Sequence, residues 1–224
     1  MTFSRQIDIL GLDGQKRLAH STVAVAGVGG LGTVVSQVLV RAGVGRLILI
    51  DHDKVELSDL NRQILYDQGD IGKRKVEASS RHLLEIRQDI KIDIFHRRVD
   101  STFFIDTKVD AVADCLDNYD SRFFLDRFCE ERDILLVHAG ISRLFGQVLS
   151  IAPGSKMRLR DVFKAVDGKH YKTQALCAAC MTVGAIQAME IINYLVYGAK
   201  GLSCAKSIMS VDLSSFCLER IPLA

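Results

Sequence analysis

Short runs of apolar residues recur along the chain between longer segments whose apolar positions have helical spacing. Runs of this length indicate strands buried on both faces, and the amphipathic segments indicate the helices that cover them. The pattern therefore predicts an α/β fold with a mostly parallel sheet flanked by helices. The predicted strands are residues 22–26, 47–51, 91–97, 111–115, 134–138 and 146–151, and the predicted helices are residues 31–41, 73–85, 121–132 and 177–197.

Beyond the last predicted helix, SIMSVDL and FCLERIPL are two stretches of alternating polarity separated by Ser214 and Ser215. They indicate an antiparallel hairpin that extends or covers the sheet edge. With 224 residues, of which 48% are hydrophobic, the chain can bury one sizeable core. We therefore expect a single domain with an antiparallel C-terminal extension.

The 29 basic and 27 acidic residues leave a net charge of +2, so the sequence offers no broad basic surface for nucleic acid or an anionic membrane. We find no apolar run of the roughly 18 residues that span a bilayer, and the N-terminus lacks the pattern of a secretion signal. A soluble cytoplasmic protein with no nucleic-acid or membrane partner is expected. Its six cysteines should be reduced thiols, because a chain of this length folds without disulfides.

A glycine-rich loop, GVGGLG, links the first predicted strand to the first predicted helix. Gly27, Gly29 and Gly32 have the G-x-G-x-x-G spacing, which allows the backbone to approach a phosphate at a helix N-terminus. Asp51, at the end of the second predicted strand, can then accept hydrogen bonds from ribose hydroxyls. The loop predicts a Rossmann-like nucleotide site, and a tight turn that only packs helix against strand is the alternative.

Basic residues gather beyond the second predicted strand, where a dinucleotide site needs few cations. Arg62 and Gln63 are followed by Lys73, Arg74 and Lys75. A triphosphate needs such residues, because Arg binds phosphate oxygens in bidentate fashion and Lys supplies a compact charge. Cations at a helix N-terminus oppose the helix dipole, so we expect one lysine to be functional and the other basic residues to lie at the surface.

The fourth predicted strand ends in DCLDNYDSR. Ligands of open parallel sheets bind beyond the carboxyl ends of the strands, so Asp117 should face the same crevice as the glycine loop. Its carboxylate could hold Mg²⁺ against the phosphates. The alternative is that Asp117 or Asn118 caps the next helix.

With these motifs assembled, the chain resembles the family of ubiquitin-activating enzymes and their bacterial relatives ThiF, MoeB and HesA. The resemblance runs from Phe3 to about Ile192 through FSRQI, GQ, GVGGLG, DHDKVELSDLNRQ, GKRKVEAS, DCLDNYDSR and QAMEII. It implies ATP-dependent adenylation of a carboxylate, with release of pyrophosphate. It also implies one adenylation domain over residues 1–224, with a nucleotide-binding half at about 1–140 and a substrate-side half at about 141–224.

The resemblance implies a role for each matching residue. Arg62, Gln63 and Lys75 would bind the phosphates, the lysine in the transition state. Asp117 would hold Mg²⁺, and Arg5 would reach across a homodimer interface into the partner's site. The implied nucleotide-binding set is Gly27, Gly29, Gly30, Gly32, Asp51, Asp53, Arg62, Gln63, Lys75 and Asp117, and the candidate catalytic set is Arg5, Arg62, Lys75, Asp117 and Cys177.

Sulfur-transferring members of this family carry two C-x-x-C pairs that hold zinc, and neither is found in its expected place here. The pair that exists, Cys177 and Cys180, lies at the start of the last predicted helix. With Cys204 and Cys217 it could complete four thiolate ligands, but the irregular spacing is a poor zinc signature, so zinc is not expected. Cys177 is either a thiolate that receives an acyl group or sulfur, or a small core residue.

Asp59 is a second departure, because the family commonly has Asn there. A neutral donor near the phosphates or the substrate becomes an acceptor, and this change could alter substrate choice or slow the chemistry. His138 and His170 could touch the substrate groove, but lone histidines are more often structural, and neither is included in the predicted site.

The substrate stays open between two classes. The first is the C-terminal Gly-Gly of a ubiquitin-like sulfur carrier protein, with a downstream acyl or sulfur acceptor protein. The second is a small-molecule carboxylate in cofactor biosynthesis, since a methanogen relative activates the pyridinol carboxylate of an iron-guanylylpyridinol cofactor and the zinc motifs are missing here. A non-catalytic nucleotide-binding partner is disfavoured by the intact site residues, and a nicotinamide-dependent dehydrogenase by the cation cluster.

Overall fold

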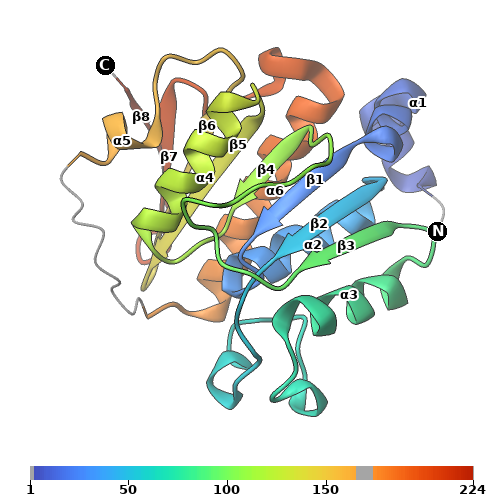
Figure 1. The fold of residues 1–224 in the computed structure, drawn as a ribbon. Helices are drawn as coiled ribbons and strands as arrows, with labels where there is room; N and C mark the ends of the chain where they lie inside the picture. Colours follow the sequence, from blue (N-terminus) through green and yellow to red (C-terminus); the bar gives the residue numbers. More distant parts are fainter. Residues whose placement is uncertain (1–2, 165–173, 224) are drawn as a thin grey trace.

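The computed structural model describes residues 3–164 and 174–223 (Figure 1). In this part of the chain one sheet has the strand order β3-β2-β1-β4-β5-β6-β7-β8. The strands are β1 (Thr22–Ala26), β2 (Arg46–Ile50), β3 (Lys91–Phe95), β4 (Ala111–Asp114), β5 (Leu135–Ser142), β6 (Phe145–Ile151), β7 (Ser207–Asp212) and β8 (Cys217–Pro222). In that order the first five strands are parallel to one another, and β6, β7 and β8 extend the sheet from β5 with antiparallel pairing. The predicted fold class, including the C-terminal hairpin, is confirmed.

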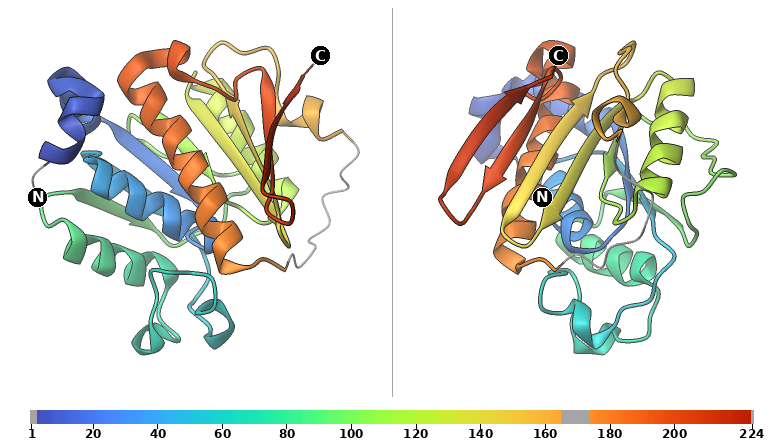
Figure 2. Two further views of the ribbon diagram at one scale, coloured as in Figure 1. Left: turned by 180° about the vertical axis from the view of Figure 1, so that it is seen from behind. Right: turned by 90° about the vertical axis from the view of Figure 1, so that its left-hand side faces the viewer.

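Helices cover both faces of the sheet (Figure 2). They are α1 (Ser4–His20), α2 (Gly30–Ala42), α3 (Lys75–Ile86), α4 (Tyr119–Glu131), α5 (Leu159–Val162) and α6 (Cys177–Tyr197), with the 3-10 turns η1 (Leu57–Asp59), η2 (Gln68–Asp70) and η3 (Gly198–Gly201). One hydrophobic cluster joins α1, α2, α3 and α6 to one sheet face, and a second joins α4 and α5 to the other. The central strands β1, β2 and β4 are therefore buried on both faces, as their continuous apolar runs predict, whereas the edge strand β8 is exposed.

Three elements differ from the sequence prediction. The short helix α5 (Leu159–Val162) was not predicted, because its four residues are too few to show a helical pattern. Helix α1 was not predicted, because its hydrophobic pattern is interrupted at Gly11, where φ is 72° and two helical segments meet at a kink. Strand β5 continues beyond residue 138 to Ser142, since it turns directly into β6. The other predicted boundaries agree with the structure to within about three residues.

Helix α6 is tied to the sheet by the two polar side chains of the QAMEII motif. The amide nitrogen of Gln187 donates to the carbonyl oxygens of Asp114 (2.9 Å), the last residue of β4, and Val137 (2.8 Å), within β5. The Glu190 carboxylate accepts from the Ser150 hydroxyl (2.8 Å) and from the Cys204 backbone nitrogen (3.0 Å). The motif therefore has a structural role, because it ties α6 to the sheet, including the end of β4 at the site.

The segment Cys177–Gly201 is long and apolar enough to cross a membrane, which corrects the expectation that no run would be. However, 56% of its apolar window is buried inside the fold. It packs against α2 and the sheet, so its apolar character is accounted for by the core.

Candidate functional site

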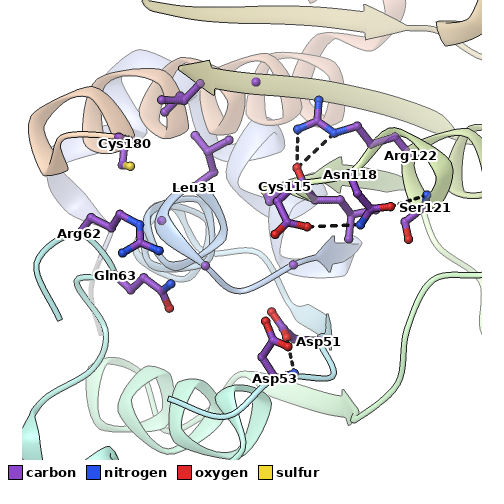
Figure 3. Close-up of a pocket in the computed structure, with 18 of the residues that line it drawn as sticks. Leu31, Asp51, Asp53, Arg62, Gln63, Cys115, Asn118, Ser121, Arg122 and Cys180 are labelled. Atoms are coloured by element: carbon purple, nitrogen blue, oxygen red, sulfur yellow. Dashed lines mark hydrogen bonds between the residues drawn. The ribbon is translucent and has the colours of Figure 1, made fainter. Parts of the chain in front are cut away.

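A cavity of about 860 Å³ opens at the carboxyl ends of β1, β2 and β4 (Figure 3). The chain turns in opposite directions after β1 and after β4, and open parallel sheets bind their ligands at such a switch point. The cavity brings together most of the residues predicted for the nucleotide. It is lined by Gly27, Gly29, Gly30, Asp51, Asp53, Arg62, Gln63, Lys75 and Asp117 from that set.

The glycines of the loop have different reasons to lack a side chain. Gly27 has a φ of 88°, and a Cβ on it would lie 2.7 Å from the carbonyl oxygen of Cys115. A Cβ on Gly32 would lie 1.8 Å from the Gly27 carbonyl oxygen, so these two glycines are required by packing. Gly29 caps α2, and a Cβ there would meet only the Gln63 amide nitrogen at 3.8 Å, which leaves its backbone open to a phosphate.

Asp51 fastens the glycine loop to the end of β2. One carboxylate oxygen accepts from the Val28 backbone nitrogen (2.8 Å), and the other accepts from the Asp53 backbone nitrogen (2.8 Å). Asp51 and Asp53 lie next to each other below the loop in Figure 3. A carboxylate accepts about four hydrogen bonds, so Asp51 retains capacity for ribose hydroxyls while it positions the loop.

The structure separates Lys75 from its two basic neighbours. Lys75 is the first residue of α3 and is only 6% exposed, with its ammonium group 3.4 Å from Asp53 and 3.5 Å from Asp59. Lys73 and Arg74 are about half exposed and pair with acidic side chains outside the cavity lining. Lys75 alone of these three lines the cavity, as expected for one functional lysine among surface cations.

Asp59 lies at the centre of the polar side chains beyond β2. It is 6% exposed and is the last residue of the turn η1, where it closes a capping box with Glu56. Its carboxylate accepts from the Gln63 amide (2.6 Å) and contacts the Arg62 guanidinium (3.4 Å) as well as Lys75. The predicted phosphate ligands therefore share one carboxylate in this structure.

Tyr66 holds the glycine loop in place and was not predicted from the sequence. Its hydroxyl donates to the Val28 carbonyl oxygen in the glycine loop (2.7 Å) and lies 2.9 Å from the Ser79 hydroxyl of α3. Burial raises the pKa of Tyr66 well above its ordinary value, so the phenol stays protonated. The tyrosine joins the glycine loop to the helix that carries Lys75. In the sequence, Tyr66 is a single aromatic residue after a polar motif, and nothing in that pattern indicates this role.

The helix cap after β4 is Asn118, not Asp117. The Asn118 side-chain oxygen accepts from the Ser121 backbone nitrogen (2.9 Å), and its amide donates to the Asp117 carboxylate (3.3 Å). Asp117 is exposed at the mouth of the cavity. Its carboxylate is therefore not needed to begin α4.

A buried group of charged side chains lies beneath the far wall of the cavity. The Asp114 carboxylate and the His138 ring are 2.7 Å apart, and Arg122 donates to the Leu116 carbonyl oxygen (3.1 Å) and lies 3.1 Å from the histidine Nδ1. Burial alone would raise the pKa of Asp114, but Arg122 and His138 hold it below its ordinary value. Burial and Arg122 lower the pKa of His138. The histidine is therefore a neutral structural residue that orients Arg122, which lines the cavity.

The two cysteines of the C-x-x-C pair take different places. Cys180 lines the cavity beside Arg62, and burial raises the pKa of its thiol. Cys177 is the half-buried first residue of α6 and does not belong to the lining. The groups of potential metal ligands among the described residues contain no cysteine, and Cys217 is exposed on β8. The predicted role of Cys177 stays a hypothesis, and His170 lies outside the described residues.

Arg5 does not reach the cavity of its own chain. It lies exposed on α1, and α1 packs at the opposite end of β1 from the glycine loop (Figure 1). A role for Arg5 in adenylation therefore requires a second copy of the chain.

Comparison with known proteins gives a family match over residues 3–224, to the model described as the ThiF family. The chain is 31% identical over 204 residues to ubiquitin-like modifier-activating enzyme 5 of Caenorhabditis elegans, covering 81% of this chain and 48% of that protein. It is 31% identical to the SAMP-activating enzyme E1 of Haloferax volcanii, covering 98% and 84%. It is 32% identical to the molybdopterin-synthase adenylyltransferase of Haemophilus influenzae, covering 100% and 94%.

The fold is also similar to solved structures. The crystal structure of E. coli MccB with ATP has a TM-score of 0.84 at 21% identity and covers 95% of this chain and 67% of that one. The complex of MccB with N-formylated MccA has a TM-score of 0.86 at 20% identity, with the same coverage. At this identity the likeness concerns the fold alone. The chain spans about half the length of the ubiquitin-like modifier-activating enzymes that it matches.

Proposed function

The chain belongs to the ThiF family, and from that premise we propose that it is an ATP-dependent adenylyltransferase. It activates a carboxylate as an acyl-adenylate and releases pyrophosphate. The observation that carries the proposal is the meeting of the glycine loop, Lys75 and Asp117 in one cavity. A nucleotide diester needs the loop alone, whereas a triphosphate that loses pyrophosphate also needs buried cations.

The proposed step is a displacement at the α-phosphorus of ATP. A substrate carboxylate oxygen forms a bond to that phosphorus, and the bond from the α-phosphorus to the bridging oxygen breaks, so that the electron pair leaves with pyrophosphate. The N-terminus of α2 and Gly29 hold a phosphate through backbone nitrogens. Lys75 and Arg62 stabilise the negative charge that develops on the leaving group. Neither covalent attachment to the protein nor a general base is needed, since the attacking carboxylate is already ionised.

The residues present fit a magnesium ion. Mg²⁺ prefers carboxylate and phosphate oxygens, and the Asp117 carboxylate lies at the cavity mouth without serving as the cap of α4. Asp117 would hold the ion next to the phosphates. When bound, the ion would neutralise part of the triphosphate charge.

The carboxylate reaches the phosphates along the antiparallel part of the sheet. Beyond the nucleotide residues, the cavity is lined by Gly140, Ser142, Gly146, Gln147 and Ser210 of β5, β6 and β7. Two of these residues are glycines, which leave room beside the strands for an extended chain. The C-terminal Gly-Gly of a ubiquitin-like sulfur carrier is the end of such a chain. The names of the relatives, which include activators of ubiquitin-like modifiers and of molybdopterin synthase, support this substrate.

The proposal includes a homodimer in which Arg5 acts in the partner's site. The exposure of Arg5 and its distance in the fold from the cavity of its own chain support this arrangement. A downstream acyl or sulfur acceptor then takes the activated group from the adenylate.

Exchange of labelled pyrophosphate into ATP tests the proposed function. Exchange that depends on a carrier ending in Gly-Gly, and that is lost when the last glycine is removed, is the expected result. Exchange only with a small acid such as a pyridinol carboxylate would support an adenylyltransferase with that class of substrate in place of the carrier protein. ATP binding without exchange under any of these conditions would instead favour a non-catalytic nucleotide-binding protein.

A further inference from the structure

The carboxylate of Asp59 occupies the hydrogen-bond donors that a phosphate would need. One oxygen, Oδ1, accepts from the Gln63 amide at 2.6 Å and lies 3.4 Å from Arg62 Nη2. The other, Oδ2, lies 3.5 Å from Lys75 Nζ and accepts from the Glu56 backbone nitrogen at 3.0 Å. Because Asp59 is almost fully buried, water screens these contacts weakly.

Arg62 is also turned toward its own loop. Its second terminal nitrogen, Nη1, donates to the Ser58 carbonyl oxygen (2.8 Å) and to the Asn61 side chain (3.1 Å). Both ends of the guanidinium are therefore engaged, although Arg62 lines the cavity. A bidentate contact to phosphate requires at least one of these ends to be released.

The orientation of the Gln63 amide is a separate sign of the same arrangement. A carboxylate only accepts hydrogen bonds, so Asp59 requires the nitrogen of that amide to face it. The amide oxygen, Gln63 Oε1, is then buried without a hydrogen-bond partner among the described residues. A buried orphan acceptor is costly, so this orientation is a strained one that a different ligand could relieve.

The charges around Lys75 also cancel. Lys75 and Arg62 each carry one positive charge, and Asp53 and Asp59 each carry one negative charge. The cluster as a whole therefore attracts a polyanion much less than its two cations would alone. Of the two carboxylates, Asp59 is the buried one and contacts both cations, whereas Asp53 is half exposed.

We propose that Asp59 is an internal competitor for the phosphates, which holds Lys75, Arg62 and Gln63 until a triphosphate takes its place on these donors. This inference rests on the proposed function and adds a positioning residue that sets nucleotide affinity. Binding of the triphosphate is an exchange of anions, in which Arg62 turns from its loop to the ligand and Gln63 is released from Asp59. Release of pyrophosphate returns the donors to Asp59, so the same carboxylate weakens ATP binding and speeds product release.

Asp59→Asn is the variant that tests this exchange of anions. Asn has the same size and its oxygen can still accept from the Glu56 nitrogen, so the turn η1 is retained. The amide carries no charge, and it can donate to Gln63 and relieve the orphan oxygen. We expect ATP with Mg²⁺ and inorganic pyrophosphate each to bind about tenfold more tightly or better by titration calorimetry. Adenosine should bind equally to both proteins, because it lacks phosphates.

Asp70→Asn is the matched control. Asp70 is likewise buried, closes a capping box in the turn η2 and pairs with cations, but it does not line the cavity. Its ATP affinity should equal that of the wild type. A merely structural role for Asp59 predicts weaker binding after substitution, so the sign of the change separates the two roles.

The outcomes of this experiment are distinct. If Asp59→Asn binds ATP equally or more weakly than the wild type does, the proposed competition by Asp59 is refuted and the adenylyltransferase proposal stands. If the affinity for adenosine rises as much as the affinity for ATP, the substitution does not act through the phosphates. The proposed competition by Asp59 is then refuted as well. If neither protein binds ATP at all, the proposed function is refuted and the inference falls with it.

Discussion

Lys75→Met gives the sharpest test of the proposed chemistry. Methionine retains much of the volume and the apolar stem of lysine but removes the charge. The ammonium group lies 3.4 Å from Asp53 and 3.5 Å from Asp59, at the first residue of α3. Among the described residues, the variant therefore removes the one buried lysine that lines the cavity, and it leaves two carboxylates without that partner.

Two magnitudes follow from this geometry. Loss of one donor that stabilises developing charge costs about 100- to 1,000-fold in turnover, and we expect the upper end because Lys75 is a full charge in a buried position. Removing one partner of a fully buried pair costs about 3 to 5 kcal/mol of folding free energy. Since Asp53 is half exposed and Asp59 keeps its contacts with Arg62 and Gln63, we expect about 2 kcal/mol.

The assay is pyrophosphate–ATP exchange, run beside denaturant unfolding of the same samples. Lys73→Met is the control, since Lys73 lies two residues away, is half exposed and pairs with Asp70 outside the cavity lining. It should keep exchange at the wild-type rate. The double variant Lys75→Met with Asp59→Asn should recover much of the lost stability, because the buried charge that lost its lysine partner is gone, but it should not recover exchange.

The decisive comparison is between the two lysines. If Lys75→Met exchanges pyrophosphate as fast as Lys73→Met while remaining folded, Lys75 does not stabilise the transition state. If the double variant regains both stability and exchange, the lysine only neutralises Asp59, and its assignment to the phosphates is wrong.

Three further predictions concern other parts of the molecule. Asp117→Ala should abolish exchange at any Mg²⁺ concentration without loss of stability, since Asn118 keeps the cap of α4; exchange restored by excess Mg²⁺ would remove Asp117 as the ligand. Arg5→Ala mixed with Asp117→Ala should regain about a quarter of wild-type exchange per protomer, because half the dimers are mixed and each has one whole site; no recovery in mixed dimers shown to form would refute a site shared in trans. Asp70 is buried, which alone raises its pKa, but hydrogen bonds from His82 and Arg81 hold that pKa well below its ordinary value. A depressed carboxyl pKa contributes stability at neutral pH that is lost as the pH falls below about 4, so Asp70→Asn should show a flatter acid limb in urea unfolding.

The parallel core of the fold could be predicted because its strands are apolar on both faces. Each of the runs 22–26 and 47–51 appears as a strand in the structure within one residue. Helix α1 was not predictable in the same way, since only Gly14, Gln15 and Leu18 of it are buried. Its position depends on polar contacts such as the Gln15 amide to the Ala42 carbonyl oxygen (3.0 Å), which hydrophobic periodicity does not report.

The site shows the same division. The glycine loop and Asp51 could be placed from motif spacing, because neighbouring strand ends bring them together. Lys75 lies beyond a long loop, and only the resemblance to the family pointed to it. The support by Tyr66 and the contacts of Asp59 could not, since both depend on how the loop 51–74 folds back on the glycine loop. The cap after β4 was left open between two adjacent residues, and only the geometry of Ser121 decides for Asn118.

The hydrogen bonds of the Gln187 side chain have a consequence for how the protein unfolds. Helix α6 belongs to the C-terminal part of the chain, yet it packs on α2 and, through that one amide, is tied to the end of β4 and to the middle of β5. A fragment that stops near residue 140 would expose the apolar face of β1 and α2, and the remaining fragment would keep a long apolar helix with nothing to cover. We therefore expect the two halves to unfold as one cooperative unit. Separately produced fragments would be insoluble alone and would regain solubility only when refolded together.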